Sequence, residues 1–207
     1  LFVRLAETPS PSGRERGVAD LIAAELRACG VDVSEDDSAP RTGAAAGNLV
    51  ARIPGRGAGT PVALCAHMDT VPVEGEIRPR VDDGIVRSDG TTILGADDKC
   101  GVAVLLEALT LLRETGTPHA PMDILFTVGE EHGLDGAKAL DPSRLRARLG
   151  YALDHSDPSS VVRGAPAKAE LHFAVRGIGG HAARPSATLS PIIAAARGIA
   201  LCPNGQI

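Results

Sequence analysis

The chain has 207 residues, of which 43% are hydrophobic and 2% aromatic, and its formal net charge is −5 at pH 7. This length suits one domain, or one domain and part of a second, with enough apolar residues for a core. The small number of aromatic residues and the negative net charge argue against nucleic-acid binding. Nor does any apolar run approach the ~20 residues that span a bilayer, so no membrane association is expected.

The cysteines and the first residues indicate the cellular setting. The four cysteines have no paired spacing, so neither a disulfide framework nor a zinc knuckle is expected. The chain starts at Leu1 without a basic region followed by a long apolar stretch, so we expect no signal peptide in it. A reduced, cytoplasmic setting is therefore the expectation.

A helix is predicted near the N-terminus. The stretch from Ser12 to Glu15 has the pattern of a capping box, in which a hydroxyl and a carboxylate bond free backbone N–H groups of the first turn. Apolar residues follow at helical spacing until Gly30, namely Val18, Leu21, Ile22 and Leu26.

Strands and one long helix follow in alternation. The strand at 62–66 is apolar on both faces, as expected of a strand covered by helices on both sides. Asp82-Asp83-Gly84 predicts a hairpin turn. The alternation indicates an α/β fold with a largely parallel sheet. The other predicted elements are strands at 31–33, 48–53, 124–128 and 151–153 and a helix over 100–114.

The pattern changes after Pro166. Residues 171–175 alternate apolar and polar side chains, which is typical of a half-exposed strand in a different kind of sheet. A helix is predicted over 192–200, with Pro191 tolerated in its first turn. We therefore expect a first domain over residues 1–165 and the beginning of a second, smaller domain over 166–207.

Acidic residues and histidines follow several of the apolar segments. Because ligands of open α/β sheets bind at the carboxyl ends of the strands, these side chains are expected to converge. Carboxylates that share a crevice repel one another unless cations neutralise them, so the pattern predicts a zinc-type or mixed divalent site with room for two metals. The segments and their polar residues are 62–66 with His67 and Asp69, 93–94 with Asp97 and Asp98, 124–128 with Glu130, Glu131 and His132, and 151–153 with Asp154 and His155.

Each of these acids also has a simpler interpretation. Asp98 precedes the helix at 100–114 and could be only its cap. Four such segments in series favour the metal site. His119 and His172 are interpreted as surface residues, and Cys65 and Cys100 as thiols that a carboxylate-rich site does not need.

Five stretches together resemble the di-zinc metallopeptidases that include tripeptidase T, carboxypeptidase G and the acyl-amino-acid deacylases. They are "AHMDTVP", "RSDGTTILGADDKCGVA", "TVGEEHGLDGA", "YALDHSD" and "GGHAARP", and the second is most similar to the tripeptidase T branch. The resemblance implies a three-layer α/β/α zinc-exopeptidase catalytic domain with a mixed, largely parallel sheet in residues 1–165. It implies that residues 166–207 begin an inserted α+β lid domain, through which the protein would form a homodimer.

The resemblance also implies the metal ligands. His67 would bind one of two zinc ions, with Asp69 as the carboxylate that orients its ring. Asp97 would bridge both ions, Asp154 would complete the ligands of the first, and Glu131 would bind the second.

Three further features follow from the same resemblance. Glu130 would be the general base, which takes a proton from the attacking water and gives it to the leaving amine. His181 would stabilise the oxyanion or hold the substrate carboxylate. The peptide bond between Asp97 and Asp98 would be cis.

The expected function is hydrolysis of a terminal peptide bond in a short peptide, by water activated between two zinc ions. The family's second metal has a further His ligand after the inserted domain, and no histidine follows His181 here. The chain is therefore expected to be the N-terminal portion of a longer enzyme and to lack one ligand by itself. Two alternatives stay open: an amidase that deacylates N-acyl amino acids, and a catalytically silent metal-binding module.

Overall fold

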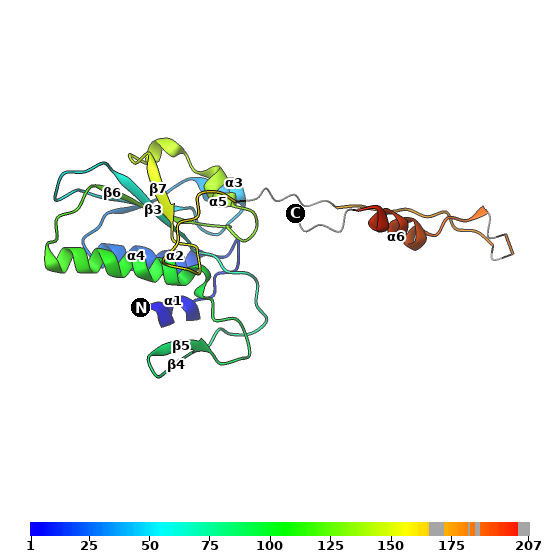
Figure 1. Ribbon diagram of the computed structural model, residues 1–207, viewed down its shortest axis with the longest axis horizontal. Coiled ribbons are helices and arrows are strands. Elements are labelled where there is room, and N and C mark those ends of the chain that lie inside the picture. The colour runs from blue at the N-terminus through cyan, green and yellow to red at the C-terminus, as the bar shows by residue number, and fades with distance from the viewer. Residues whose placement is uncertain (166–171, 182, 185–186, 203–207) are drawn as a thin grey trace. The chain divides into compact units, whose positions relative to one another are not determined.

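The computed structural model describes residues 1–165, 172–181, 183–184 and 187–202 (Figure 1). The chain forms two compact units, Leu1–Pro158 and Ser159–Ile207. In the described part of the chain, every helix is too short or too polar to cross a membrane.

The first unit is built around a mixed five-stranded sheet with the strand order β1-β2-β6-β3-β7. β2 pairs antiparallel with both β1 and β6, whereas β3 pairs parallel with both β6 and β7. Four of these five strands therefore run in one direction, which confirms the expected mixed, largely parallel sheet. The strands are β1 (Val33–Glu35), β2 (Leu49–Ile53), β3 (Val62–His67), β6 (Met122–Thr127) and β7 (Leu149–Ala152).

The register of the central strands brings their carboxyl ends together. β3 and β6 pair from Val62 opposite Met122 to His67 opposite Thr127. On its other side β3 pairs with β7 as far as Cys65 opposite Ala152. The residues that follow these three strands therefore leave the sheet at one edge.

Helices pack against this sheet. α4 (Ala96–Thr115) contacts β3 and also α1 and α2, and Figure 1 shows α2 and α4 together on one face of the sheet. α4 ends at Gly116, whose φ of 67° is the left-handed conformation of a helix C-cap. The other helices of this unit are α1 (Phe2–Glu7), α2 (Arg16–Ala28), α3 (Ser38–Thr42), α5 (Asp135–Ala139) and the 3₁₀ turn η1 (Pro142–Arg144).

The core lies between α2, α4 and the central strands. Large apolar side chains there are fully buried, and each contributes about 1.5–3 kcal/mol relative to an exposed position. Val62 to Cys65 are only half-buried, and the neighbouring β7 is exposed. The prediction that 62–66 is covered on both faces is therefore wrong. The half of the sheet formed by β3 and β7 is less covered than the neighbouring strand β6. Core residues from these elements are Val18, Ile22, Leu26, Val102, Leu105, Leu106, Ile124 and Phe126.

The hairpin turn is where the sequence predicts it. β4 (Pro79–Asp82) and β5 (Ile85–Ser88) pair antiparallel around Asp83 and Gly84. Their φ angles of 50° and 76° are both left-handed, as a tight two-residue turn of the I′ type requires.

The second unit contains α6 (Pro191–Leu201), which confirms the predicted helix. Ser190 Oγ accepts a hydrogen bond from the backbone N–H of Ile193 and so caps the first turn. The strand predicted at 171–175 is not observed over 172–175, and Leu171 lies outside the described residues. Strand-like pairing occurs instead as an isolated antiparallel bridge between Ile178 and Leu189.

Candidate metal centre

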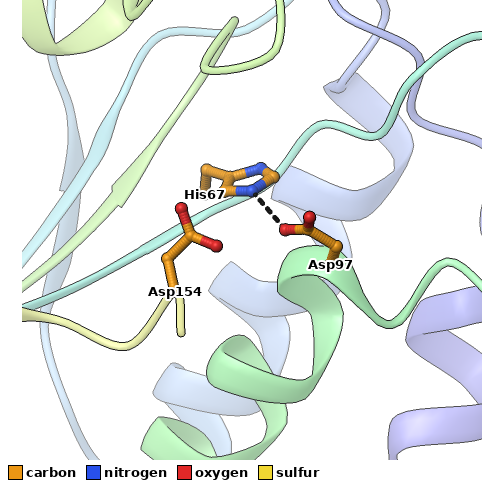
Figure 2. Close-up of side chains that lie close together, drawn as sticks. All are labelled: His67, Asp97 and Asp154. Carbon is orange, nitrogen blue, oxygen red and sulfur yellow. Dashed lines mark hydrogen bonds and ion pairs between the residues drawn. The ribbon is translucent and has the colours of Figure 1, made fainter. Parts of the chain in front are cut away.

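The carboxyl edge of the sheet gathers one histidine and four carboxylates. His67 ends β3, the two glutamates follow β6, Asp154 follows β7, and Asp97 lies in the first turn of α4. Ligand atoms of His67, Asp97 and Asp154 lie within 4.8 Å of one another, and Figure 2 shows both carboxylates beside the imidazole. Ligand atoms of His67, Glu130 and Glu131 form a second group within the same limit.

His67 is the residue that these two groups share. Its side chain is buried, and its Nδ1 lies 2.9 Å from the backbone oxygen of Asp69 and 3.4 Å from Oδ1 of that residue. With a metal bound, Nδ1 would keep the proton that it shares with Asp69, and Nε2 would be the ligand atom. Nε2 lies 3.0 Å from Oδ1 of Asp97.

The protonation of His67 reflects these carboxylates. Burial alone would lower the pKa of His67, but Asp69, Asp97 and Asp98 together raise it to about 9. Since a metal binds only the neutral imidazole, a cation at this site would take the place of the proton on Nε2.

Asp97 and Asp98 have different environments although they are adjacent. The peptide bond between them is cis, as the resemblance implied. The Asp97 side chain is 71% exposed and faces His67. Asp98 is buried, and it accepts hydrogen bonds from the backbone N–H of His67 at 3.2 Å and of Gly101 at 3.1 Å. Asp98 is therefore more than a helix cap, because it joins the first turn of α4 to the end of β3, and burial raises its pKa to about 7.

The other three carboxylates destabilise one another's charge. Burial raises the pKa of Glu130, Glu131 and Asp154, and neighbouring carboxylates raise each further, against an opposing effect of His67. A divalent cation stabilises such a set of carboxylates, because its positive charge offsets their mutual repulsion.

The donor atoms suit zinc or another divalent ion, because they are one imidazole nitrogen and several carboxylate oxygens. Cys65 lies near the same end of β3, but it belongs to neither group of potential ligands, and burial raises the pKa of its thiol to about 12. The residues present therefore fit a bound metal ion.

Asp69 has more partners than the sequence predicts. It is fully buried, and its carboxylate accepts hydrogen bonds from the backbone N–H groups of Glu130 at 3.0 Å and Glu131 at 3.1 Å. The hydroxyl of Ser12 donates a third at 2.6 Å. Burial alone would raise the pKa of Asp69, but His67 and these donors hold it below its ordinary value.

The predicted capping box at the start of α2 is therefore wrong. Ser12 bonds Asp69, and Glu15 makes no side-chain cap although it occupies the cap position. The Glu15 carboxylate accepts from the backbone N–H groups of Gly13 at 2.8 Å and Gly129 at 3.1 Å. The sequence pattern does not reveal either residue as a neighbour of the site, because local capping explains the pattern equally well.

The structure also places two further residues or segments that the sequence singled out. Ile93 and Leu94 do not form a strand, so Asp97 is placed by the start of α4 instead. His181 belongs to the second unit, where it is exposed and its Nδ1 accepts a hydrogen bond from the backbone N–H of Ala183 at 3.2 Å. Its catalytic role stays a prediction.

The fold and these residues fit a metal centre, and comparison with known proteins identifies a peptidase family. Residues 48–170 match peptidase family M28, and the chain belongs to this family. It is 38% identical to protein YqjE of Bacillus subtilis, over 100% of this chain and 56% of that one. It is 30% identical to the cytosol non-specific dipeptidase of Escherichia coli, over 79% of this chain and 34% of the dipeptidase.

Two solved structures are also similar. A tripeptidase from Staphylococcus aureus has a TM-score of 0.83 and 34% identity, over 99% of this chain and 56% of that one. Aminopeptidase PepT from Bacillus cereus has a TM-score of 0.76 and 36% identity, over 100% of this chain and 56% of that one. The chain thus spans little more than half the length of these structures.

Proposed function

We propose that this chain carries most of the metal centre of an exopeptidase that hydrolyses a terminal peptide bond in short peptides. The observation that supports the proposal is the convergence of four carboxylates on His67, at the carboxyl edge of a largely parallel sheet. The names of similar proteins, a tripeptidase and an aminopeptidase, support a peptide as the substrate.

In this proposal the ligand residues divide between two metal ions. His67, Asp97 and Asp154 would hold one ion, Asp97 would bridge to a second, and Glu131 would bind that second ion. Divalent ions supply Lewis acidity, which lowers the pKa of water and polarises a carbonyl.

Glu130 would accept the proton of the attacking water and return it to the leaving amine. A general base must be deprotonated before it reacts and basic enough to take a proton, and a raised pKa meets the second requirement. Burial and the nearby acids raise the pKa of Glu130, which supports this assignment.

Residues 166–207, which form most of the second unit, would contribute substrate binding. We assign residues 1–165 to the catalytic domain and 166–207 to the beginning of a lid domain through which two copies pair. His181 would then hold the oxyanion or the substrate carboxylate. A cytoplasmic location fits the same proposal, and one relative is named a cytosol dipeptidase.

The test is a substrate and metal screen on the full-length protein. Purified protein is stripped with a chelator, reloaded with zinc, and assayed with tripeptides, dipeptides and N-acyl amino acids. We expect zinc-dependent release of a terminal residue from tripeptides. Preference for N-acyl amino acids would favour the amidase alternative. Zinc binding without hydrolysis of either class would favour the silent module.

A further inference from the structure

The segment Ser10–Glu15 contacts both loops that carry the candidate metal ligands. On one side, the hydroxyl of Ser10 donates to the backbone oxygen of Met68 at 2.9 Å, and the backbone N–H of Thr70 donates to the backbone oxygen of Ser10 at 2.9 Å. These contacts join the segment to the loop that follows β3.

The other contacts of the segment reach the loop after β6. Ser12 donates to Asp69 Oδ2, and the same oxygen accepts the backbone N–H of Glu131. Oε1 of Glu15 accepts the backbone N–H of Gly129, the residue before Glu130. Two carboxylates therefore hold the backbone on both sides of Glu130. The Asp69 carboxylate, which Ser12 fixes, holds Glu131, and the Glu15 carboxylate holds Gly129.

The burial of Glu15 supports a role in the site. Glu15 is fully buried, and its Oε2 has no hydrogen-bond partner among the described residues. An unpaired buried carboxylate oxygen costs stability, so a residue that only capped a helix would be expected at the surface. The other carboxylate oxygen of Glu15, Oε1, accepts hydrogen bonds from the backbone N–H groups of Gly13 and Gly129.

We propose that Ser12 and Glu15 are positioning residues, which fix the backbone of residues 129–131 and so direct the Glu130 and Glu131 carboxylates into the metal centre. This inference rests on the proposed metal centre and adds residues to it that touch neither metal nor substrate. Outer groups that orient metal ligands typically change metal affinity or activity by about 10–100-fold when they are removed.

The first experiment compares four full-length proteins: wild type, Ser12→Ala, Ser12→Thr and Ser34→Ala. Ser34 is a matched control, because its hydroxyl also makes one hydrogen bond, to the backbone oxygen of Val50 on β2. Zinc affinity is measured by competition with a chelator, and thermal unfolding of the metal-free proteins is measured in parallel. We expect Ser12→Ala to weaken zinc binding about 10-fold or more, Ser12→Thr to restore it, and Ser34→Ala to leave it unchanged.

A double-mutant cycle distinguishes positioning from general stability. If Ser12 acts through Glu131, Ser12→Ala should have little further effect on zinc affinity in a Glu131→Gln background. Equal zinc affinity in Ser12→Ala and wild type, or full additivity with Glu131→Gln, would overturn the inference while the metal centre stands. A wild-type protein that binds no zinc would overturn the metal centre and the inference together.

Glu15 is tested with a variant that keeps its size. Glu15→Gln retains a carbonyl oxygen that can accept from Gly13 and Gly129, so zinc affinity should stay within about 3-fold of wild type, whereas Glu15→Ala should lose 10-fold or more. Equal zinc affinities in the two variants would contradict the role assigned to Glu15. If Glu15→Ala does not fold, the Ser12 variants still decide the proposal.

Discussion

The backbone N–H of His67 donates to Oδ2 of Asp98 at 3.2 Å, so the last residue of β3 is attached to the first turn of α4. The other oxygen of Asp98 accepts the backbone N–H of Gly101. A Cβ atom at Gly101 would lie 2.3 Å from Oδ1 of Asp98 and 2.7 Å from the backbone oxygen of Leu153, directly before Asp154. Glycine at this position therefore lets the helix approach the loop after β7 and leaves room for the Asp98 carboxylate.

Gly101→Ala should accordingly destabilise the protein. Either Asp98 or the Leu153 carbonyl must move, and overpacking of this kind costs about 1–3 kcal/mol. The matched control is Gly17→Ala in α2, where a Cβ would meet Thr8 Cγ2 at an ordinary 3.4 Å. The control should be neutral or stabilise by up to about 1 kcal/mol, because alanine favours a helix. Urea unfolding of both variants measures the difference, and equal stabilities would contradict the packing argument.

The convergence of the candidate metal ligands could be predicted because it depends on a general property of parallel strands. His67, Glu131 and Asp154 each follow a short apolar run, and runs that pair in parallel end at one edge. This prediction did not require knowing which strand pairs with which. The cis bond after Asp97, by contrast, was expected from family resemblance alone.

The contacts of Ser12 could not be predicted in this way. Ser12 and Asp69 are 57 positions apart, and their hydrogen bond exists only because the N-terminal segment lies beside the loop after β3. A capping box needs four adjacent residues, so the local pattern gave a competing explanation that used fewer assumptions. The predicted strand is not observed over 172–175, the described part of its range, for a related reason: alternation shows which side chains share a face but supplies no partner strand.

Zinc should stabilise the folded protein through the shared histidine. A ligand that binds only the folded state adds about 2.7 kcal/mol at a concentration 100 times its dissociation constant. Thermal unfolding of the full-length protein with zinc and with a chelator measures this shift. His67→Ala should lose most of it, because His67 belongs to both ligand groups. His119→Ala is the control, since the ring of His119 bonds the backbone oxygen of Ala120 and belongs to neither group. A zinc shift that survives in His67→Ala would place the metal elsewhere.

Acid should destabilise the first unit partly through Asp123. This side chain is fully buried, and its carboxylate accepts from the backbone N–H groups of Arg146 at 2.6 Å and Ala147 at 2.9 Å, and from Arg146 Nε at 3.0 Å. Burial alone would raise the pKa of Asp123, but these donors hold it below its ordinary value. A lowered pKa stabilises the folded state above the unfolded pKa of about 3.9, and this contribution is lost as pH falls through the folded pKa.

Asp123→Asn should therefore flatten the acid limb of the stability curve. The free energy of unfolding of wild type should fall more steeply below about pH 4 than that of the variant. Asp32→Asn removes the same charge at an exposed position and serves as the control. Equal slopes in wild type and Asp123→Asn, from urea unfolding at a series of pH values, would show that Asp123 is not the titrating group.

The two adjacent glutamates should separate chemistry from metal binding. Glu130→Gln keeps the size of the side chain but removes its proton acceptor, so turnover of a tripeptide by the full-length protein should fall by about 10²–10⁴-fold with zinc content nearly unchanged. Glu131→Gln should instead lower zinc stoichiometry or affinity, because a neutral amide oxygen is a poorer ligand than a carboxylate. The two variants are each other's controls, since both lose one negative charge at neighbouring positions of one loop. Zinc content by elemental analysis and turnover are measured on the same preparations. Equal loss of zinc from both would mean that the glutamates are not divided into base and ligand, and undiminished turnover in Glu130→Gln would exclude Glu130 as the base.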